Sequence, residues 1–203
     1  RVGHGAGAGK EKRVMKAMAK ALVAKGISTV LFNFPYMQTI KATGKRRPPD
    51  KADKLMSHFT AVIETCSKDN KALHNLPVFI GGKSMGGRMA TMVYEAVSNV
   101  KGAIALGYPF HPPGKPEKTR TEHLQTASKP LLIIQGERDT FGTKSEVEDY
   151  KKRSVLSTGI ECAYLDDGDH SFKPRKASGK TQEEHIATAA TLTASFIEAH
   201  LNN

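Results

Sequence analysis

The sequence predicts one α/β domain, residues 1–203, with a mostly parallel sheet and helices on both faces. Three observations support this fold class. The length of 203 residues fits a single domain. Short, nearly continuous apolar runs are typical of strands buried on both faces. These runs alternate with segments in which apolar residues recur at helical spacing.

Five runs rich in Val, Ile, Leu and Phe are the predicted strands. They cover residues 28–34, 78–81, 102–106, 130–135 and 160–165. We interpret Val2 and Gly3 as the end of a sixth strand. The sequence opens at Arg1 without a methionine, so we expect N-terminal residues, including one or two strands, to be missing from it.

Four helices are predicted between and after these strands. They cover residues 50–67, 84–97, 143–153 and 181–201. Two long connections, 35–49 and 108–129, follow predicted strands and are rich in Pro, Gly, Lys and Arg. Ligands of open parallel sheets bind at the carboxyl ends of the strands. We therefore expect the two connections to flank a binding site.

The charge and the cysteines narrow the class of protein. Lys and Arg exceed Asp and Glu by 31 to 20, but the excess is spread along the chain. We interpret it as surface charge and expect no nucleic-acid partner. No apolar run approaches the length of a membrane span, so no membrane partner is expected. Cys66 and Cys162 match no metal-ligand spacing. They are interpreted as buried free thiols in a cytoplasmic protein without a metal or cofactor.

The sharpest motif is Gly82-Lys83-Ser84-Met85-Gly86, which matches G-x-S-x-G between a predicted strand and a predicted helix. In this setting the serine occupies a tight turn above the sheet and acts as a nucleophile. A phosphate-binding loop would require a glycine five residues before Gly82, where Pro77 stands. The motif therefore predicts that Ser84 is a catalytic nucleophile.

Two further residues complete a catalytic triad in the order Ser, Asp, His. Asp139 follows the strand at 130–135, and His170 follows the strand at 160–165. Both therefore belong to the same edge of the sheet as Ser84. Glu137 is an alternative to Asp139 as the acid that orients the histidine.

Acyl transfer also requires hydrogen-bond donors for the oxyanion. The N–H of Met85, next to the nucleophile, is one predicted donor. The second is expected in the glycine-rich segment 4–7, where we choose Ala6 and place Gly7 second. The expected substrate-binding residues come from the two long connections: Tyr36, Tyr108, Phe110 and His111.

Several segments resemble a known superfamily. The sequences HGAG at 4–7, GKSMGG at 82–87 and DGDHSF at 167–172 resemble α/β-hydrolases, within them the dienelactone-hydrolase-like branch. The segments 107–116 and 136–142 are similar to small bacterial hydrolases related to a subunit of a eukaryotic histone-acetyltransferase complex and to a testis-expressed protein. The resemblance implies an α/β-hydrolase fold without a large cap domain and a triad of Ser84, Asp139 and His170. Dienelactone hydrolases proper carry a cysteine nucleophile where this chain has Ser84, so their activity is not expected.

The sequence as a whole predicts a serine hydrolase that cleaves small esters or thioesters through an acyl-enzyme on Ser84. A scaffold or adaptor with the same fold and no catalytic role is the alternative. We also hypothesise that Lys115, Lys118 and Arg120 favour an anionic substrate group. A merely solvated basic loop is the competing interpretation.

Overall fold

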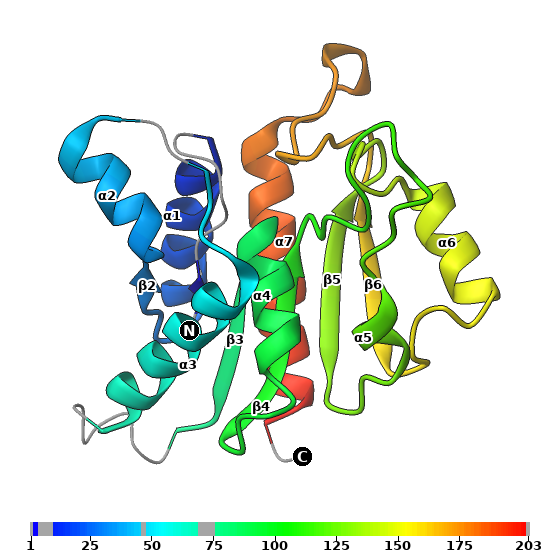
Figure 1. Cartoon of the computed structure of the whole chain (residues 1–203). Coiled ribbons are helices and arrows are strands. Elements are labelled where there is room, and N and C mark those ends of the chain that lie inside the picture. Colours follow the sequence, from blue (N-terminus) through cyan, green and yellow to red (C-terminus); the bar gives the residue numbers. More distant parts are fainter. Residues whose placement is uncertain (1, 4–9, 46–47, 69–75, 202–203) are drawn as a thin grey trace.

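A computed structural model describes residues 2–3, 10–45, 48–68 and 76–201 of the chain (Figure 1). Its six-stranded sheet has the order β2-β1-β3-β4-β5-β6, and all neighbouring strands run parallel. The strands are β1 (Val2–Gly3), β2 (Leu31–Phe32), β3 (Val78–Lys83), β4 (Val100–Leu106), β5 (Leu131–Gly136) and β6 (Ile160–Leu165).

Helices cover both faces of this sheet. They are α1 (Lys10–Val23), α2 (Pro35–Thr43), α3 (Ala52–Lys68), α4 (Met85–Val93), α5 (Glu122–Gln125), α6 (Lys144–Lys152) and α7 (Gln182–Ala199), with a short 3₁₀ turn at Lys176–Ser178. Helices α1 and α7 pack together behind the sheet in Figure 1, and α3 and α4 lie in front. The predicted fold class, a parallel sheet between two helical layers, is confirmed.

Two hydrophobic clusters fill the space between the sheet and its helices. The cluster on one face includes Met15 and Met18 of α1 and Ile134 of β5. The cluster on the other face includes Phe59 of α3 and Ile133 of β5. All residues of β3 and β5 are buried, which accounts for their nearly continuous apolar sequences.

Capping boxes begin the last two helices. Thr143 accepts a hydrogen bond from the Glu146 N–H, and the Glu146 carboxylate accepts one from the Thr143 N–H. Thr181 and Glu184 repeat the arrangement at α7. Each box satisfies N–H groups at the helix start that have no partner within the helix. The connections after β5 and β6 therefore reach their helices at fixed points.

Helices α1 and α2 are corrections to the sequence-based prediction. Buried residues of α1 recur at helical spacing at Val14, Met18 and Leu22, but many lysines lie between them and weaken the apolar signal. The connection predicted at 35–49 contains α2, whose first residue is Pro35, a residue that suits the first helical turn. The long loop before residue 50 is thus partly helical.

The second strand and the cysteines also differ from expectation. The strand predicted over 28–34 is only two residues long, and Leu31 and Phe32 pair with Val2 and Gly3 of β1. Cys66 and Cys162 form no disulfide, as expected, but they are half-buried rather than buried. Partial burial raises the pKa of the Cys162 thiol to about 11. Among the described residues, no helix is both long and apolar enough to cross a membrane.

The strand order changes direction at one position in the sheet. From β1 the chain moves outward to β2, then returns to β3 on the other side of β1. The order therefore reverses between β1 and β3. In open parallel sheets such a reversal leaves a crevice at the carboxyl ends of the strands, where ligands bind. Ser84 directly follows β3 at this position.

Candidate active site

Ser84 lies in a sharp turn between β3 and α4. Its backbone has φ 54° and ψ −120°, a conformation that residues with a side chain rarely adopt. The Ser84 N–H still donates to the Leu106 carbonyl at 2.8 Å, so the turn is tied to the neighbouring strand β4. The side chain is 7% exposed. The strand–turn–helix context predicted for the G-x-S-x-G motif is present.

Glycines allow the turn to pack this closely. A Cβ at Gly87 would lie 2.7 Å from the Gly82 carbonyl oxygen and 3.2 Å from Ala105. A Cβ at Gly81 would lie 2.5 Å from the Ile104 carbonyl oxygen. Side chains at these positions would push α4 and β4 away from the turn. The glycines around Ser84 therefore place the serine through the backbone.

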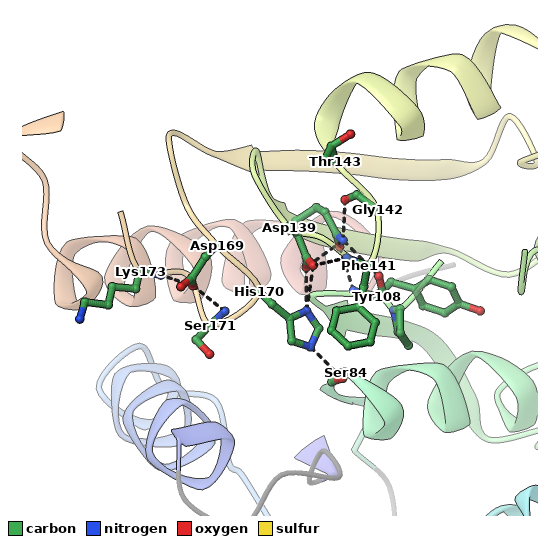
Figure 2. A network of polar contacts seen from close by, with 12 residues as sticks. Ser84, Tyr108, Asp139, Phe141, Gly142, Thr143, Asp169, His170, Ser171 and Lys173 are labelled. Carbon is green, nitrogen blue, oxygen red and sulfur yellow. Dashed lines mark hydrogen bonds and ion pairs between the residues drawn. The ribbon is translucent and has the colours of Figure 1, made fainter. Parts of the chain in front are cut away.

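His170 lies in the loop that follows β6. Asp169 holds this loop by accepting the backbone N–H groups of Ser171 at 2.7 Å and Lys173 at 2.9 Å (Figure 2). The loop also packs against the end of β5. A Cβ at Gly136, the last residue of β5, would clash with the Asp169 carbonyl oxygen. The two loops that carry the predicted acid and base are thus packed directly against each other.

Asp139 is fully buried beneath His170. Its Oδ1 accepts the Phe141 N–H at 2.9 Å, and its Oδ2 accepts the Gln135 side-chain amide at 3.0 Å. Both carboxylate oxygens also face Nδ1 of His170, at 3.0 and 2.8 Å. A buried carboxylate needs such donors to remain in place.

Ser84, His170 and Asp139 form one continuous hydrogen-bonded chain (Figure 2). Nε2 of His170 lies 2.9 Å from Oγ of Ser84. Because a carboxylate only accepts, Nδ1 carries the proton toward Asp139, and the lone pair on Nε2 of the neutral ring faces the serine hydroxyl. The structure brings together three residues that are as much as 86 positions apart in the sequence.

Two residues that contact the Ser84–His170–Asp139 hydrogen bonds were not singled out from the sequence. Gln135 is fully buried at the end of β5, and its amide donates to Asp139, to the Tyr108 carbonyl at 3.1 Å and to the Gly142 carbonyl at 3.0 Å. Its Oε1 accepts the Tyr108 N–H at 2.8 Å, which fixes the amide orientation. The sequence signal that could have identified Gln135 is that a polar residue ends an otherwise apolar strand.

Phe141 is the second such neighbour. Its ring lies 4.2 Å from the ring of His170, centroid to centroid, at an angle of 30°. The two rings are therefore partly stacked, and the aromatic side chain limits how the imidazole can turn (Figure 2). Nothing in the sequence distinguished Phe141 from other loop aromatics.

Glu137, the alternative acid, makes other contacts. Its carboxylate accepts the Lys144 ammonium at 2.8 Å and the Asp167 N–H at 3.0 Å. Arg138 pairs with Asp167 at 2.9 Å. These contacts connect the loops after β5 and β6 on their outer side, whereas Asp139 alone of the two acids reaches His170.

The two predicted oxyanion donors are the N–H groups of Met85 and Ala6. Met85 is the first residue of α4, where helix N–H groups lack partners within the helix and carry partial positive charge. Donation from Met85 to an oxyanion stays a prediction. Ala6 and Gly7 lie outside the described residues.

Among the described residues, no group of three or more His, Cys, Asp or Glu side chains could hold a metal ion.

The four expected substrate-binding residues are all buried. Tyr108 and Phe110 are fully enclosed, Tyr36 is 1% exposed and His111 is 3% exposed. The Tyr108 hydroxyl donates to the Arg120 carbonyl at 2.7 Å, and burial raises its pKa to about 12. Tyr108, Phe110 and His111 belong to the connection after β4, whereas Tyr36 is in α2. Direct contact with a substrate stays a prediction.

Known proteins resemble this chain in sequence and in structure. The sequence model of a family described as alpha/beta hydrolase domain matches residues 2–198. A serine hydrolase without a lid from Xanthomonas campestris is similar in structure, with a TM-score of 0.71 and 17% identity over 100% of this chain and 82% of that one. An esterase from Pyrococcus furiosus has a TM-score of 0.70 and 17% identity over 99% and 81%.

A third solved structure is a dienelactone hydrolase from Anabaena variabilis, with a TM-score of 0.66 and 18% identity over 99% of this chain and 85% of that one. At these identities the structures establish the shared fold. No helical domain of the described residues is inserted over the carboxyl edge of the sheet, in agreement with the expected absence of a large cap. The match over residues 2–198 shows that the chain belongs to the alpha/beta hydrolase family.

Proposed function

We propose that this hydrolase is a serine esterase or thioesterase that acts on small acyl substrates through an acyl-enzyme on Ser84. The observation that carries the proposal is the hydrogen-bonded chain from Ser84 Oγ through His170 to the buried Asp139. A serine hydroxyl is a weak nucleophile unless an oriented base accepts its proton. The neighbouring esterases and serine hydrolases support the same reaction class.

The proposed mechanism uses each residue at the atom it presents. Nε2 of His170 takes the proton from Ser84 as Oγ attacks the acyl carbon, and Asp139 holds the ring and stabilises the imidazolium. The N–H groups of Met85 and Ala6 are the proposed donors to the oxyanion. His170 then protonates the leaving group. A water molecule, deprotonated by the same Nε2, hydrolyses the acyl-enzyme and regenerates Ser84.

The finer parts of the proposal come from the sequence. The loop motifs favour the dienelactone-hydrolase-like branch and its small bacterial members, and a serine nucleophile argues against dienelactone hydrolysis itself. The two cysteines, which form no disulfide, favour a cytoplasmic location. The substrate is proposed to be a small molecule that needs no cofactor.

A fluorophosphonate probe tests the proposal directly, since it labels only a serine activated by its neighbours. We expect the wild-type protein to be labelled on Ser84 and to hydrolyse short acyl esters. Ser84→Ala should lose both properties with little change in melting temperature, because the turn and not the hydroxyl holds the backbone. Ser57→Ala, at an exposed position of α3, is the matched control and should behave as wild type.

Each other outcome has a definite meaning. Labelling that survives in Ser84→Ala would place the nucleophile elsewhere. A wild-type protein that is folded, unlabelled and inactive toward every ester and thioester tested would contradict the proposal and favour the scaffold alternative.

A further inference from the structure

Two arginines on the segments that follow Ser84 and β4 take no part in the mechanism above. Arg88 is on α4, four residues after Ser84, so its Cα lies about 6 Å further along the helix axis. Arg120 belongs to the connection that follows β4. Both side chains are partly exposed and therefore accessible to a ligand.

Tyr108 and its surroundings hold the two arginines in place. The Tyr108 hydroxyl donates to the Arg120 carbonyl at 2.7 Å, and the Arg120 N–H donates to the Phe110 carbonyl at 2.8 Å. The Arg120 guanidinium makes a long hydrogen bond of 3.4 Å to the Pro109 carbonyl. The Arg88 side chain is also a hydrogen-bond partner of Tyr108, and the charges of Arg88 and Arg120 oppose the rise in the Tyr108 pKa that burial causes.

The cluster continues into α5 with another basic residue. Nε2 of His123 lies 2.9 Å from the hydroxyl oxygen of Thr91. Thr91 is on α4, about one helical turn after Arg88. Burial and then the charge of Arg88 lower the pKa values of both Arg120 and His123. Glu122 acts on His123 in the opposite sense, but its own side chain is exposed.

No carboxylate balances the two guanidinium groups within the described residues. Neither Arg88 nor Arg120 forms an ion pair there, although the other three arginines from residue 76 onward do: Arg138, Arg153 and Arg175. Nε of Arg88 is buried without a hydrogen-bond partner among the same residues. Two like charges held beside one phenol repel each other. An anion that contacts both guanidinium groups would relieve this repulsion.

We propose that Arg88 and Arg120 bind a carboxylate or phosphate group of the substrate, so that the preferred substrate is an anionic acyl ester or thioester. This inference rests on the proposed function and names its substrate class. Guanidinium groups match the planar geometry of such oxyanions and bind them through paired hydrogen bonds. The site differs from the sequence-based hypothesis, because Lys115 and Lys118 are exposed and only Arg120 of the three belongs to the cluster.

Matched esters provide the kinetic test. One substrate is the 4-nitrophenyl ester of glutarate, which ends in a free carboxylate; its neutral partner has that carboxylate capped by a methyl group. We expect wild type to favour the anionic ester, with less preference at high salt because exposed charges are screened. Arg88→Gln and Arg120→Gln should each raise KM for the anionic ester about tenfold, and change KM for the neutral ester less than about twofold. Succinate and adipate analogues show which spacer fits best.

Lys118→Gln is the control, since it removes one charge from the same loop outside the cluster. It should leave the preference unchanged. An equal loss of preference in Lys118→Gln and Arg88→Gln would contradict a defined site and indicate a diffuse field. No preference in wild type would also overturn the inference while the proposed function stands, provided that the neutral ester is hydrolysed.

A binding measurement is independent of catalysis. Inorganic phosphate at millimolar concentration should raise the melting temperature of the wild-type and Ser84→Ala proteins, because a ligand that binds only the folded state stabilises it. The double variant Arg88→Gln, Arg120→Gln should remain folded, since it removes a repulsion, and should lose the shift. Sodium chloride at equal ionic strength separates specific binding from screening. A shift that persists in the double variant, or its absence from wild type, would refute an oxyanion site at these arginines.

Discussion

The proposed nucleophile and the proposed acid–base pair are held in place by different means. Ser84 depends on the backbone: a turn with positive φ, a hydrogen bond to β4 and glycines that let α4 approach. Asp139 and His170 depend on side chains, because Gln135 and Asp169 bind the loops that carry them. The serine is thus placed by sterics, whereas the base is placed by a network that single substitutions can loosen gradually. Substitutions in the two regions should therefore fail in different ways.

The largest effect is expected from Asp139→Asn. The amide no longer requires a proton on Nδ1 of His170, so the ring can take the tautomer whose protonated Nε2 cannot accept from Ser84. We expect kcat to fall about 10⁴-fold with a nearly unchanged KM, measured with a short acyl ester. A Glu137→Gln variant should lose far less activity, because Glu137 binds Lys144 instead of His170. Equal losses would contradict the assignment of Asp139.

Gln135→Met should weaken the acid–base region without removing a reacting group. The sulfur side chain fills a similar volume but gives up the donor to Asp139 and the acceptor for the Tyr108 N–H. We expect kcat to fall about tenfold to a hundredfold while KM changes little, since a loosened base acts on the chemical step. Gln125→Met, at an exposed position of α5, is the control. A change confined to KM would argue against a positioning role.

Gly87→Ala tests the nucleophile region through stability. The new Cβ would lie 2.7 Å from a backbone oxygen that cannot move without shifting β3. We expect a loss of about 1–3 kcal/mol in the free energy of unfolding, together with reduced labelling of Ser84. Gly159→Ala, where a Cβ would meet only the Ser157 hydroxyl at 4.0 Å, should be neutral in urea unfolding. Equal stability of the two variants would show that the turn tolerates a wider approach.

The smallest effect concerns acid. Hydrogen bonds from Arg175, first through its side chain and then its backbone N–H, lower the pKa of Asp167 to about 2. A carboxylate with a lowered pKa in the folded state contributes stability above the pKa of the unfolded state, and this contribution is lost as pH falls through the folded value. The stability advantage of wild type over Asp167→Asn should therefore shrink between about pH 4 and pH 2. Urea midpoints across this range measure it, and an advantage that stays constant would contradict the role of Asp167.

Much of the site could be predicted because it follows from chain direction. Strands that alternate with helices run parallel, so the residues after each strand meet at one edge. Ser84, Asp139 and His170 each follow a strand and were therefore predicted together. The α1 helix was missed although its apolar residues have the correct spacing, since its lysines lower the average hydropathy of the segment.

The sequence by itself determined the fold class, the turn at Ser84 and the three strand-end loops, because these depend on local patterns and strand order. Only the tertiary structure decided which side chains face inward. It buried Tyr108 and Phe110, and it brought Gln135 to Asp139. It also set α4, which carries Arg88, against α5 through the contact of Thr91 with His123. Such contacts join loop residues whose orientation no periodicity fixes; they are settled by packing between distant segments.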